Sequence, residues 1–260
     1  MNRLITIGIL MIILLPGCEK YDIPKDYPTT YYILSSGALS KQRSEYSSRN
    51  PYISSSLNEF GFCGYSGAPL SVTTPPSAGA KTREEIIDIV KHFVSENRNE
   101  TGVDHPDAIT FSVASTDTGY NGSVGWYFRT ANQRADTIEV LNTSILFHVT
   151  NASMTLCCGN WYPEIFIPRK FNISQDVAKN NLIGKVVSHY SFDGTLSQVT
   201  IAAADVENSS VNLKIIPAED DGKIELHLCW QVNIPAPVYY EIYIDVMTGS
   251  IIVEEPTIIS

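Results

Sequence analysis

The sequence predicts an α+β protein in which two consecutive units each pack one helix against an antiparallel β-sheet. The prediction rests on an order of elements that occurs twice: a capped helix, then a run of strand-like segments. The two helices begin at Thr82 and Ser174, and linker-like sequence over residues 163–169 separates the two runs. Because a helix with one apolar face must bury that face, we expect each helix to lie across its own sheet.

The first 17 residues have the pattern of an export signal. Arg3 precedes an unbroken apolar run from Leu4 to Leu15, and Gly17 then stands directly before Cys18. The run is shorter than the ~20 apolar residues that span a hydrocarbon core. A cysteine after a small residue at this point is typical of a lipobox. We therefore predict cleavage before Cys18 and attachment of fatty acyl chains such as palmitate to that residue.

Lipid on Cys18 would make the protein a membrane-anchored lipoprotein of the cell envelope. Glu19 follows the cysteine in place of Asp, which in a Gram-negative bacterium permits sorting to the outer membrane. We therefore expect the protein at the outer membrane. The alternative is an uncleaved short anchor with an incidental cysteine, but Cys18 lies at the boundary between apolar and polar sequence.

Residues 18–80 are expected to form a tether that begins with the lipidated cysteine. Tyr, Ser, Pro and Gly dominate this segment, no helical or strand period persists in it, and a turn-like stretch over residues 75–80 ends it. A flexible chain of about 60 residues spans ~40 Å on average. The folded units would then lie away from the membrane surface.

Residues 81–168 are predicted to form the first helix-on-sheet unit. Thr82 and Glu85 have the spacing of a capping box, and apolar residues then recur at helical spacing until the helix ends near Asn97. Strand-like sequence follows at residues 109–114, 124–130, 137–150 and 154–158, with turn residues between the first two.

Residues 169–260 are predicted to form the second unit. Ser174 can cap a short helix that ends at Gly184. Strands are expected at residues 199–203, 211–216, 224–234, 239–246 and 250–253. In the third of these, apolar residues from Leu226 to Ile234 alternate with a mostly polar set, so one face of that strand belongs to a core.

The composition is that of an acidic globular protein. Hydrophobic residues make up 43% of the chain, which supplies a core, and the formal charge of −10 argues against nucleic acid as a partner. In addition to Cys18, the chain has Cys63, Cys157, Cys158 and Cys229. Buried free thiols are the favoured interpretation, and one bridge stays open because an exported compartment permits it. Adjacent Cys157 and Cys158 cannot both reach a distant partner easily.

Two pieces of the second unit resemble a PepSY domain. They are a Leu-x-Trp-x-Val strand around Trp230 and a Tyr-x-Asp-x-x-Thr-Gly hairpin that contains Asp245 and Gly249. The preceding unit, through Trp126, is similar to the fungalysin/thermolysin propeptide motif that commonly precedes PepSY. The resemblance extends over roughly residues 80–256 and includes a junction similar to that of lipoproteins from Bacteroides-type bacteria. It implies a cystatin-like fold for each unit and a chaperone or inhibitor role toward a peptidase.

The resemblance singles out Trp126, Trp230, Asp245 and Gly249, for which we expect structural roles. The two tryptophans are expected to pack between sheet and helix. The carboxylate of Asp245 is expected to accept backbone N–H groups in the turn to Gly249.

The sequence contains no pattern typical of a catalytic, metal or cofactor site. No two histidines have the spacing of a zinc peptidase, and nucleophile elbows, phosphate-binding loops and dinucleotide fingerprints are absent. The acidic stretch over residues 219–221 lacks the spacing of a calcium loop and is typical of a solvated hairpin tip. We therefore expect no enzyme activity, no cofactor and no metal.

These features favour a non-catalytic interaction module of the cell envelope. Its expected partners are the membrane, through lipid on Cys18, and a secreted peptidase or another envelope protein. Because no peptidase follows within this sequence, we expect inhibition or regulation in trans. The alternative is a structural or glycan-binding surface lipoprotein that uses aromatic strand faces.

Overall fold

The computed structural model describes residues 23–64, 73–76, 81–118, 124–190 and 196–257. The export signal and Cys18 therefore lie outside the described residues. Among the helices of the described part, none is long and apolar enough to cross a membrane.

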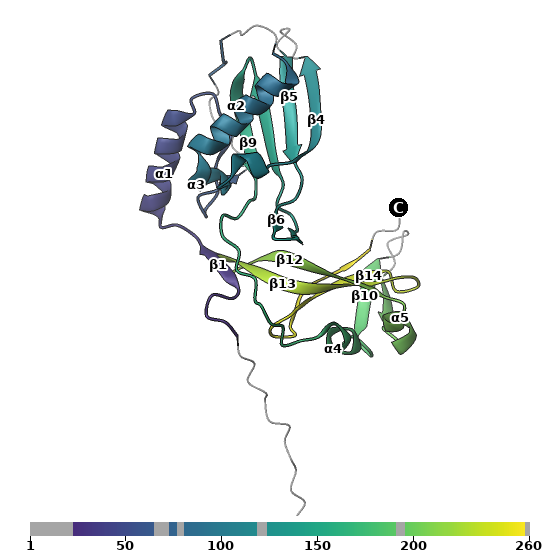
Figure 1. Cartoon of the computed structure of the whole chain (residues 1–260). Coiled ribbons are helices and arrows are strands. Elements are labelled where there is room, and N and C mark those ends of the chain that lie inside the picture. Colours follow the sequence, from purple (N-terminus) through teal and green to yellow (C-terminus); the bar gives the residue numbers. More distant parts are fainter. Residues whose placement is uncertain (1–22, 65–72, 77–80, 119–123, 191–195, 258–260) are drawn as a thin grey trace, which may run out of the picture.

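Helices and mainly antiparallel strands alternate along the chain, which confirms the predicted α+β class (Figure 1). In chain order the elements are β1 (Thr29–Tyr32), α1 (Ser36–Arg49), β2 (Ser56–Leu57), β3 (Cys63–Gly64), α2 (Arg83–Glu96), α3 (Arg98–Thr101), η1 (Pro106–Ala108), β4 (Phe111–Thr118), β5 (Val124–Thr130), β6 (Arg134–Ala135), β7 (Ile138–Val140), β8 (Ile145–Thr150), β9 (Ser153–Gly159), α4 (Gln175–Asn180), β10 (Val186–Tyr190), β11 (Leu196–Thr200), α5 (Ala203–Glu207), β12 (Ser210–Asp220), β13 (Lys223–Ile234), β14 (Tyr240–Asp245) and β15 (Ile251–Pro256).

The first unit is an antiparallel sheet in the order β4-β5-β8-β9, with α2 across one face (Figure 1). Helix α2 begins at the predicted capping box, in which the side chains of Thr82 and Glu85 each accept the other residue's backbone N–H. Its buried residues, one helical turn apart, include Val90 and Phe93, and they pack with Phe147 of β8 in one core. Burial of each such side chain contributes about 1.5–3 kcal/mol, so packing rather than capping holds α2 on the sheet.

The second sheet has the order β15-β14-β13-β12-β7-β6, and β1 also pairs with β13. Strands β12 to β15 are antiparallel, whereas β7 runs parallel to β12. Cys229 and Gln231, on the other face of β13, are buried too, so the predicted alternation of burial fails in the middle of the strand. It holds on either side: Leu226, Leu228, Val232 and Ile234 are buried. The last two of these share a core with residues of α4 and α5, which lie against this sheet (Figure 1).

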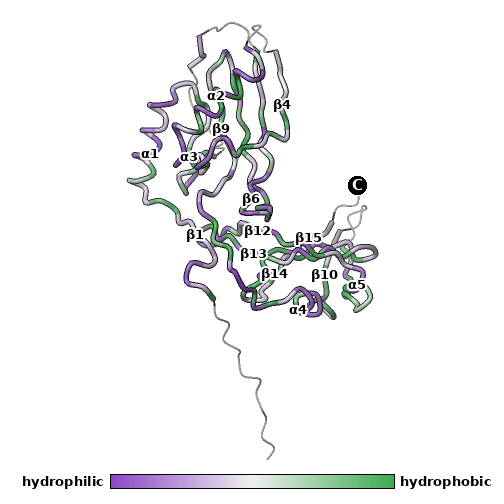
Figure 2. The backbone as a smooth tube through the Cα atoms, in the orientation of Figure 1, coloured by the Kyte–Doolittle hydropathy of each residue, from purple (hydrophilic) through white to green (hydrophobic). Residues whose placement is uncertain are grey.

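The tether expected over residues 18–80 is corrected by the structure, because the described residues 23–64 are folded into both units. Strand β1 pairs with β13 from Thr29 opposite Leu226 to Tyr32 opposite Lys223. Helix α1 and the β2–β3 hairpin pack on the first unit, with Tyr46 in its core. Figure 2 shows why this segment lacks a core pattern: α1 is mostly hydrophilic, whereas apolar residues are concentrated in the strands of both sheets.

The boundary expected at residue 168 is also corrected. The single strand predicted over 137–150 is two strands that belong to different sheets: β7 pairs with β12 of the second sheet, and β8 pairs with β5 of the first. The chain turns between them through Asn142, whose φ is +58°. In the second unit, the strand predicted over 199–203 is replaced by the end of β11 and the start of α5.

Candidate functional site

The turn after β14 is organised by one oxygen of Asp245. Oδ1 accepts the backbone N–H groups of Met247 and Thr248, both at 2.8 Å, and the hydroxyl of Thr248 at 3.1 Å. The backbone N–H of Gly249 donates to the carbonyl of Asp245 at 2.9 Å. Gly249 has a φ of +75°, in the left-handed region that glycine adopts without a steric cost.

The second oxygen of Asp245, Oδ2, binds side chains from distant parts of the chain. The hydroxyl of Tyr27 donates to it at 2.6 Å, and Nδ1 of His227 lies 2.7 Å from it. Nε2 of His227 faces Oε2 of Glu225 at 3.6 Å, and Glu225 pairs with Lys223 at 2.7 Å. Carboxylates and nitrogen groups therefore alternate from the buried turn along β13.

The electrostatics of this cluster follow from burial and hydrogen bonding. Burial opposes the charge on Asp245, but the hydrogen bonds from His227, Tyr27 and the turn outweigh burial and lower the pKa of its carboxyl. Burial and the bond to Asp245 raise the pKa of Tyr27, so its hydroxyl stays protonated and donates. Burial, with the nearby charge of Asp245, also raises the pKa of the Cys229 thiol well above its ordinary value.

Tyr27 fills a gap in the hydrogen bonding of the second sheet. Strands β1 and β14 both pair with β13, β1 with its first part and β14 with its last part. Between them, the N–H of Leu228 donates to the Tyr27 hydroxyl and its carbonyl accepts from Val246, both at 2.9 Å. Tyr27 thus satisfies a buried backbone donor that neither strand pairs with.

The cluster holds the turn and the N-terminal segment against β13. Asp245 has no exposed surface, and each of its oxygens already accepts hydrogen bonds. Both ring nitrogens of His227 face carboxylates.

The sequence singled out Asp245 and Gly249, which the structure brings into one turn, but not the partners of the carboxylate. Tyr27 lay in the segment taken for a tether. His227 is one of the histidines that lack the spacing of a zinc peptidase. Its position on the polar face of β13, two residues from Glu225, was the available signal.

Trp126 and Trp230 lie in different sheets, and Trp230 pairs with Ile244 just before the turn of Asp245. Nε1 of Trp230 donates to the carbonyl of Ile173 at 2.9 Å, and its ring meets Phe171 edge-on with 5.6 Å between centroids. Trp230 therefore ties β13 to the segment before α4. Trp126 stacks on Phe128, with 6.0 Å between centroids, at the border of the core beneath α2.

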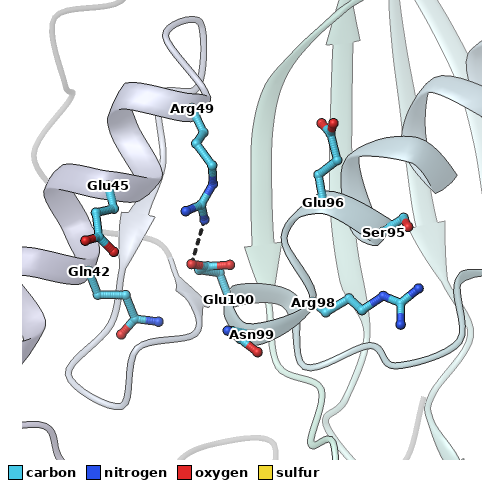
Figure 3. Close-up of a pocket in the computed structure, with 8 residues that line it drawn as sticks. All are labelled: Gln42, Glu45, Arg49, Ser95, Glu96, Arg98, Asn99 and Glu100. Carbon is cyan, nitrogen blue, oxygen red and sulfur yellow. Dashed lines mark hydrogen bonds and ion pairs between the residues drawn. The ribbon is translucent and has the colours of Figure 1, made fainter.

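A polar hollow of about 490 Å³ lies between α1 and the end of α2 (Figure 3). Its lining residues are Gln42, Glu45, Arg49, Ser95, Glu96, Arg98, Asn99 and Glu100. Figure 3 shows Arg49 pointing across to Glu100, to which it pairs at 2.7 Å, while Arg98 points away. The Glu100 side chain is only 7% exposed, so this ion pair fastens α1 to α3. Within the described ranges, no group of three or more His, Cys, Asp or Glu is placed to hold a metal ion.

The edges of the two sheets differ in what covers or protects them. The N-terminal segment covers β9, since the N–H of Ser54 donates to the carbonyl of Thr155 at 2.9 Å. Strand β15 has Glu254, Glu255 and Pro256 at its end. Strand β4 pairs with β5, and no other described strand pairs with it. Its residues 112–116 are exposed, with Val113 at 50%.

No protein-family model matches the sequence, and no curated protein matches it. Among solved structures, the chain is similar to the Bacillus megaterium YpeB C-terminal domain, at a TM-score of 0.31 and 15% sequence identity, over 78% of this chain and 76% of that chain. A likeness at that TM-score carries no argument about function.

Proposed function

We propose that this chain is a non-catalytic interaction module of the bacterial cell envelope that regulates a secreted peptidase in trans. The observation that carries the proposal is the exposed edge of β4, with which only β5 pairs among the described strands and which is uncharged from Phe111 to Thr116. The resemblance of the sequence to PepSY and propeptide units supplies the class of partner. In this proposal both units are cystatin-like, and lipid on Cys18 holds the protein at the outer membrane.

The edge of β4 is suited to an extended segment of another protein. Such a segment can pair with an exposed strand through backbone hydrogen bonds, while alternate side chains give selectivity. Proteins usually protect long edges with charges, Pro or a covering element. Strand β15 has such protection in Glu254, Glu255 and Pro256, and β9 has a cover. In β4 the one charged residue is Asp117, near the end of the strand, and residues 111–116 are uncharged.

We propose that the chain is non-catalytic because the titratable groups around Asp245 already bind one another. Asp245 and His227 bind to each other and to groups of the same chain. Cys229 opposite Asp245 is buried with a raised pKa, so its nucleophilic thiolate is scarce.

Peptidase inhibition by residues 19–260 tests the function and the edge together. The assay uses a purified thermolysin-type peptidase secreted by the same bacterium, with casein as substrate. The double variant Val113→Lys/Ser115→Lys should inhibit at least about tenfold less well, a loss of roughly 1.4 kcal/mol in binding. The control Ile251→Lys, on β15, should inhibit like the wild type.

Two outcomes would count against the proposal. Failure of the wild-type protein to inhibit the peptidase at micromolar concentration would exclude that peptidase as the partner. Full inhibition by the β4 variant, with an unchanged melting temperature, would remove the edge as the binding surface.

The anchor has a separate test. Cys18→Ala should move the protein from the membrane fraction to the soluble fraction while its circular dichroism spectrum stays the same. If the Cys18→Ala protein still binds to the membrane after residues 1–17 have been cleaved off, lipid attachment at Cys18 is contradicted.

The alternative, a structural or glycan-binding surface lipoprotein, makes a different demand on the chain. It needs aromatic rings exposed along a strand face. Tyr240 is 6% exposed and Trp230 is tied to Ile173, but Tyr239 is 36% exposed. Glycan-array binding that Tyr239→Ala abolishes and Val113→Lys leaves intact would favour this alternative.

A further inference from the structure

Two cysteines that are far apart in the sequence meet in the core of the first unit. Cys63 of β3 and Cys157 of β9 are 1% and 0% exposed. Strand β3 lies beside β9, and the two cysteines belong to one buried core cluster. After burial, Cys63 is one of the groups that raise the pKa of the Cys157 thiol. The hydroxyl of Tyr46 lies 3.4 Å from Sγ of Cys63 and closes the cluster from α1.

The backbone on both sides of this contact is fixed by hydrogen bonds. The N–H of Cys157 donates to the hydroxyl of Ser55 at 3.2 Å, and the N–H of Ser54 donates to the carbonyl of Thr155 at 2.9 Å. The N–H of Asn58 donates to the carbonyl of Phe62 at 2.8 Å within the β2–β3 hairpin. The two cysteines are therefore held near each other by the fold, and neither is on a free surface segment.

The other described cysteines are not placed to compete for this contact. Successive side chains of a strand point to opposite faces, so Cys158 points away from the core that contains Cys157. Cys158 instead lines a surface hollow with Arg129 and Leu146. Cys229 lies in the second sheet, where it packs with Ile216 and Tyr243.

We propose that Cys63 and Cys157 form a disulfide bond in the exported protein, joining the N-terminal segment to β9. The proposal rests on the export proposed above, because disulfides persist in oxidising compartments and not in a reducing cytoplasm. The bond would hold in place the segment that covers the β9 edge. That leaves β4 as the open edge of the same sheet.

The oxidant is a thiol–disulfide oxidoreductase of the envelope in its disulfide form. The thiolate of one cysteine attacks that disulfide, whose S–S bond breaks as a mixed disulfide forms. The thiolate of the second cysteine then displaces the oxidoreductase and forms the Cys63–Cys157 bond. Two electrons pass to the oxidoreductase, and the protons lost by the two cysteines are balanced by those on its two new thiols.

The bond forms while the chain folds. Burial raises the pKa of the Cys157 thiol well above its ordinary value, so its thiolate is scarce once the core has closed. A buried sulfur is also out of reach of an enzyme. The bridge is therefore a structural bond and not a switch, and it closes a loop that contains α2 and the strands from β4 to β8.

Mass spectrometry of the full chain, expressed with its own signal in a Gram-negative host, tests the bond. The protein is denatured without reductant in N-ethylmaleimide and digested. A peptide pair linked through Cys63 and Cys157 is expected, with Cys158 and Cys229 alkylated. The chain without residues 1–17, expressed in a reducing cytoplasm, should have all four of these thiols alkylated.

Variants and heat give a second measurement. Reduction should lower the melting temperature of the exported wild type by about 10 °C, because the bond closes a long loop. Cys158→Ser should behave in the same way, whereas reduction should not change the melting temperature of Cys63→Ser/Cys157→Ser. If the double variant does not fold, the linked peptide of the wild type still decides.

Two results in a protein that has lost its signal would overturn the disulfide: alkylation of all four cysteines, or a link from Cys63 to Cys158. Either result would leave the proposals of export and peptidase regulation unaffected. A protein that retains its signal would overturn the export on which the bond depends.

Discussion

Asp245 is a buried carboxylate that connects the turn after β14, the strand β13 and the N-terminal segment. Its substitution by Asn removes the charge that His227 and Tyr27 bind. Because loss of one partner leaves buried polar groups unpaired, Asp245→Asn should lower the free energy of unfolding by about 3 kcal/mol. Urea unfolding followed by fluorescence measures this. The control Asp107→Asn, at an exposed carboxylate that Lys91 pairs with at 2.8 Å, should cost little.

The pH dependence of stability should report the same carboxylate. The folded-state pKa of Asp245 is lowered, so its contribution is present above the unfolded pKa of ~3.9 and is lost as the pH falls through the lower folded value. The free energy of unfolding of the wild type should therefore fall more steeply between about pH 5 and pH 2 than that of Asp245→Asn. Parallel slopes for the two proteins would contradict a charge-dependent role.

Substitution of three glycines with positive φ by Ala can distinguish the cost of backbone strain from the cost of steric contact. A Cβ at Gly184 (φ +86°) meets no atom within 4 Å, one at Gly249 (φ +75°) lies 3.3 Å from Cδ1 of Ile173, and one at Gly102 (φ +71°) lies 2.1 Å from the carbonyl oxygen of Trp161. Replacement by Ala costs roughly 1–2 kcal/mol from the left-handed backbone alone. Gly184→Ala should show that cost, Gly249→Ala slightly more, and Gly102→Ala much more, since backbone must move. Chemical denaturation that ranks Gly102→Ala with Gly184→Ala would contradict this.

At the scale of elements, the hydroxyl of Tyr27, just before β1, supports the pairing of β1 with β13. Tyr27→Phe removes the acceptor of the Leu228 N–H and a donor to Asp245, which should cost about 2 kcal/mol. Hydrogen exchange should show faster exchange at the amide of Leu228 and along β1. Tyr31→Phe, which loses a hydroxyl that bonds Glu164 near the surface, is the matched control and should cost less. Equal protection of Leu228 in wild type and Tyr27→Phe would show that the hydroxyl does not hold this donor.

The elements also show how far local sequence predicts this fold. Helix α2 was predicted because its cap and its apolar spacing are both local signals. Helix α1 was not, since Tyr46 is its one buried residue among the described residues of that helix. Strands β1 and β7 are short, and their partners in β13 and β12 are distant in the sequence. The turn of Asp245 and Gly249 was predictable because its residues are close in the sequence. The link of Asp245 to Tyr27 was not, because the two residues are far apart in the sequence.

On the scale of the whole molecule, the N-terminal segment belongs to both cores. Tyr46 and Leu57 lie in the core beneath α2, while Tyr27, Phe60 and Phe62 lie in the core of the second sheet. The β6–β7 hairpin likewise joins the second sheet from within the sequence of the first unit. The two units therefore share elements, and we expect neither to be a separable domain.

This sharing makes a truncation the sharpest test of the corrected organisation. If residues up to 80 were a tether, residues 81–260 would fold alone. Removal of Tyr46, Leu57, Phe60 and Phe62 instead uncovers both cores, and at about 1.5–3 kcal/mol for each buried side chain the loss is comparable to the whole stability of a typical domain, about 5–15 kcal/mol. We expect residues 81–260 to lack a near-ultraviolet circular dichroism signal and to bind the dye ANS, and residues 23–260 to resemble the full chain. A sharp, cooperative melting transition for residues 81–260 would restore the tether.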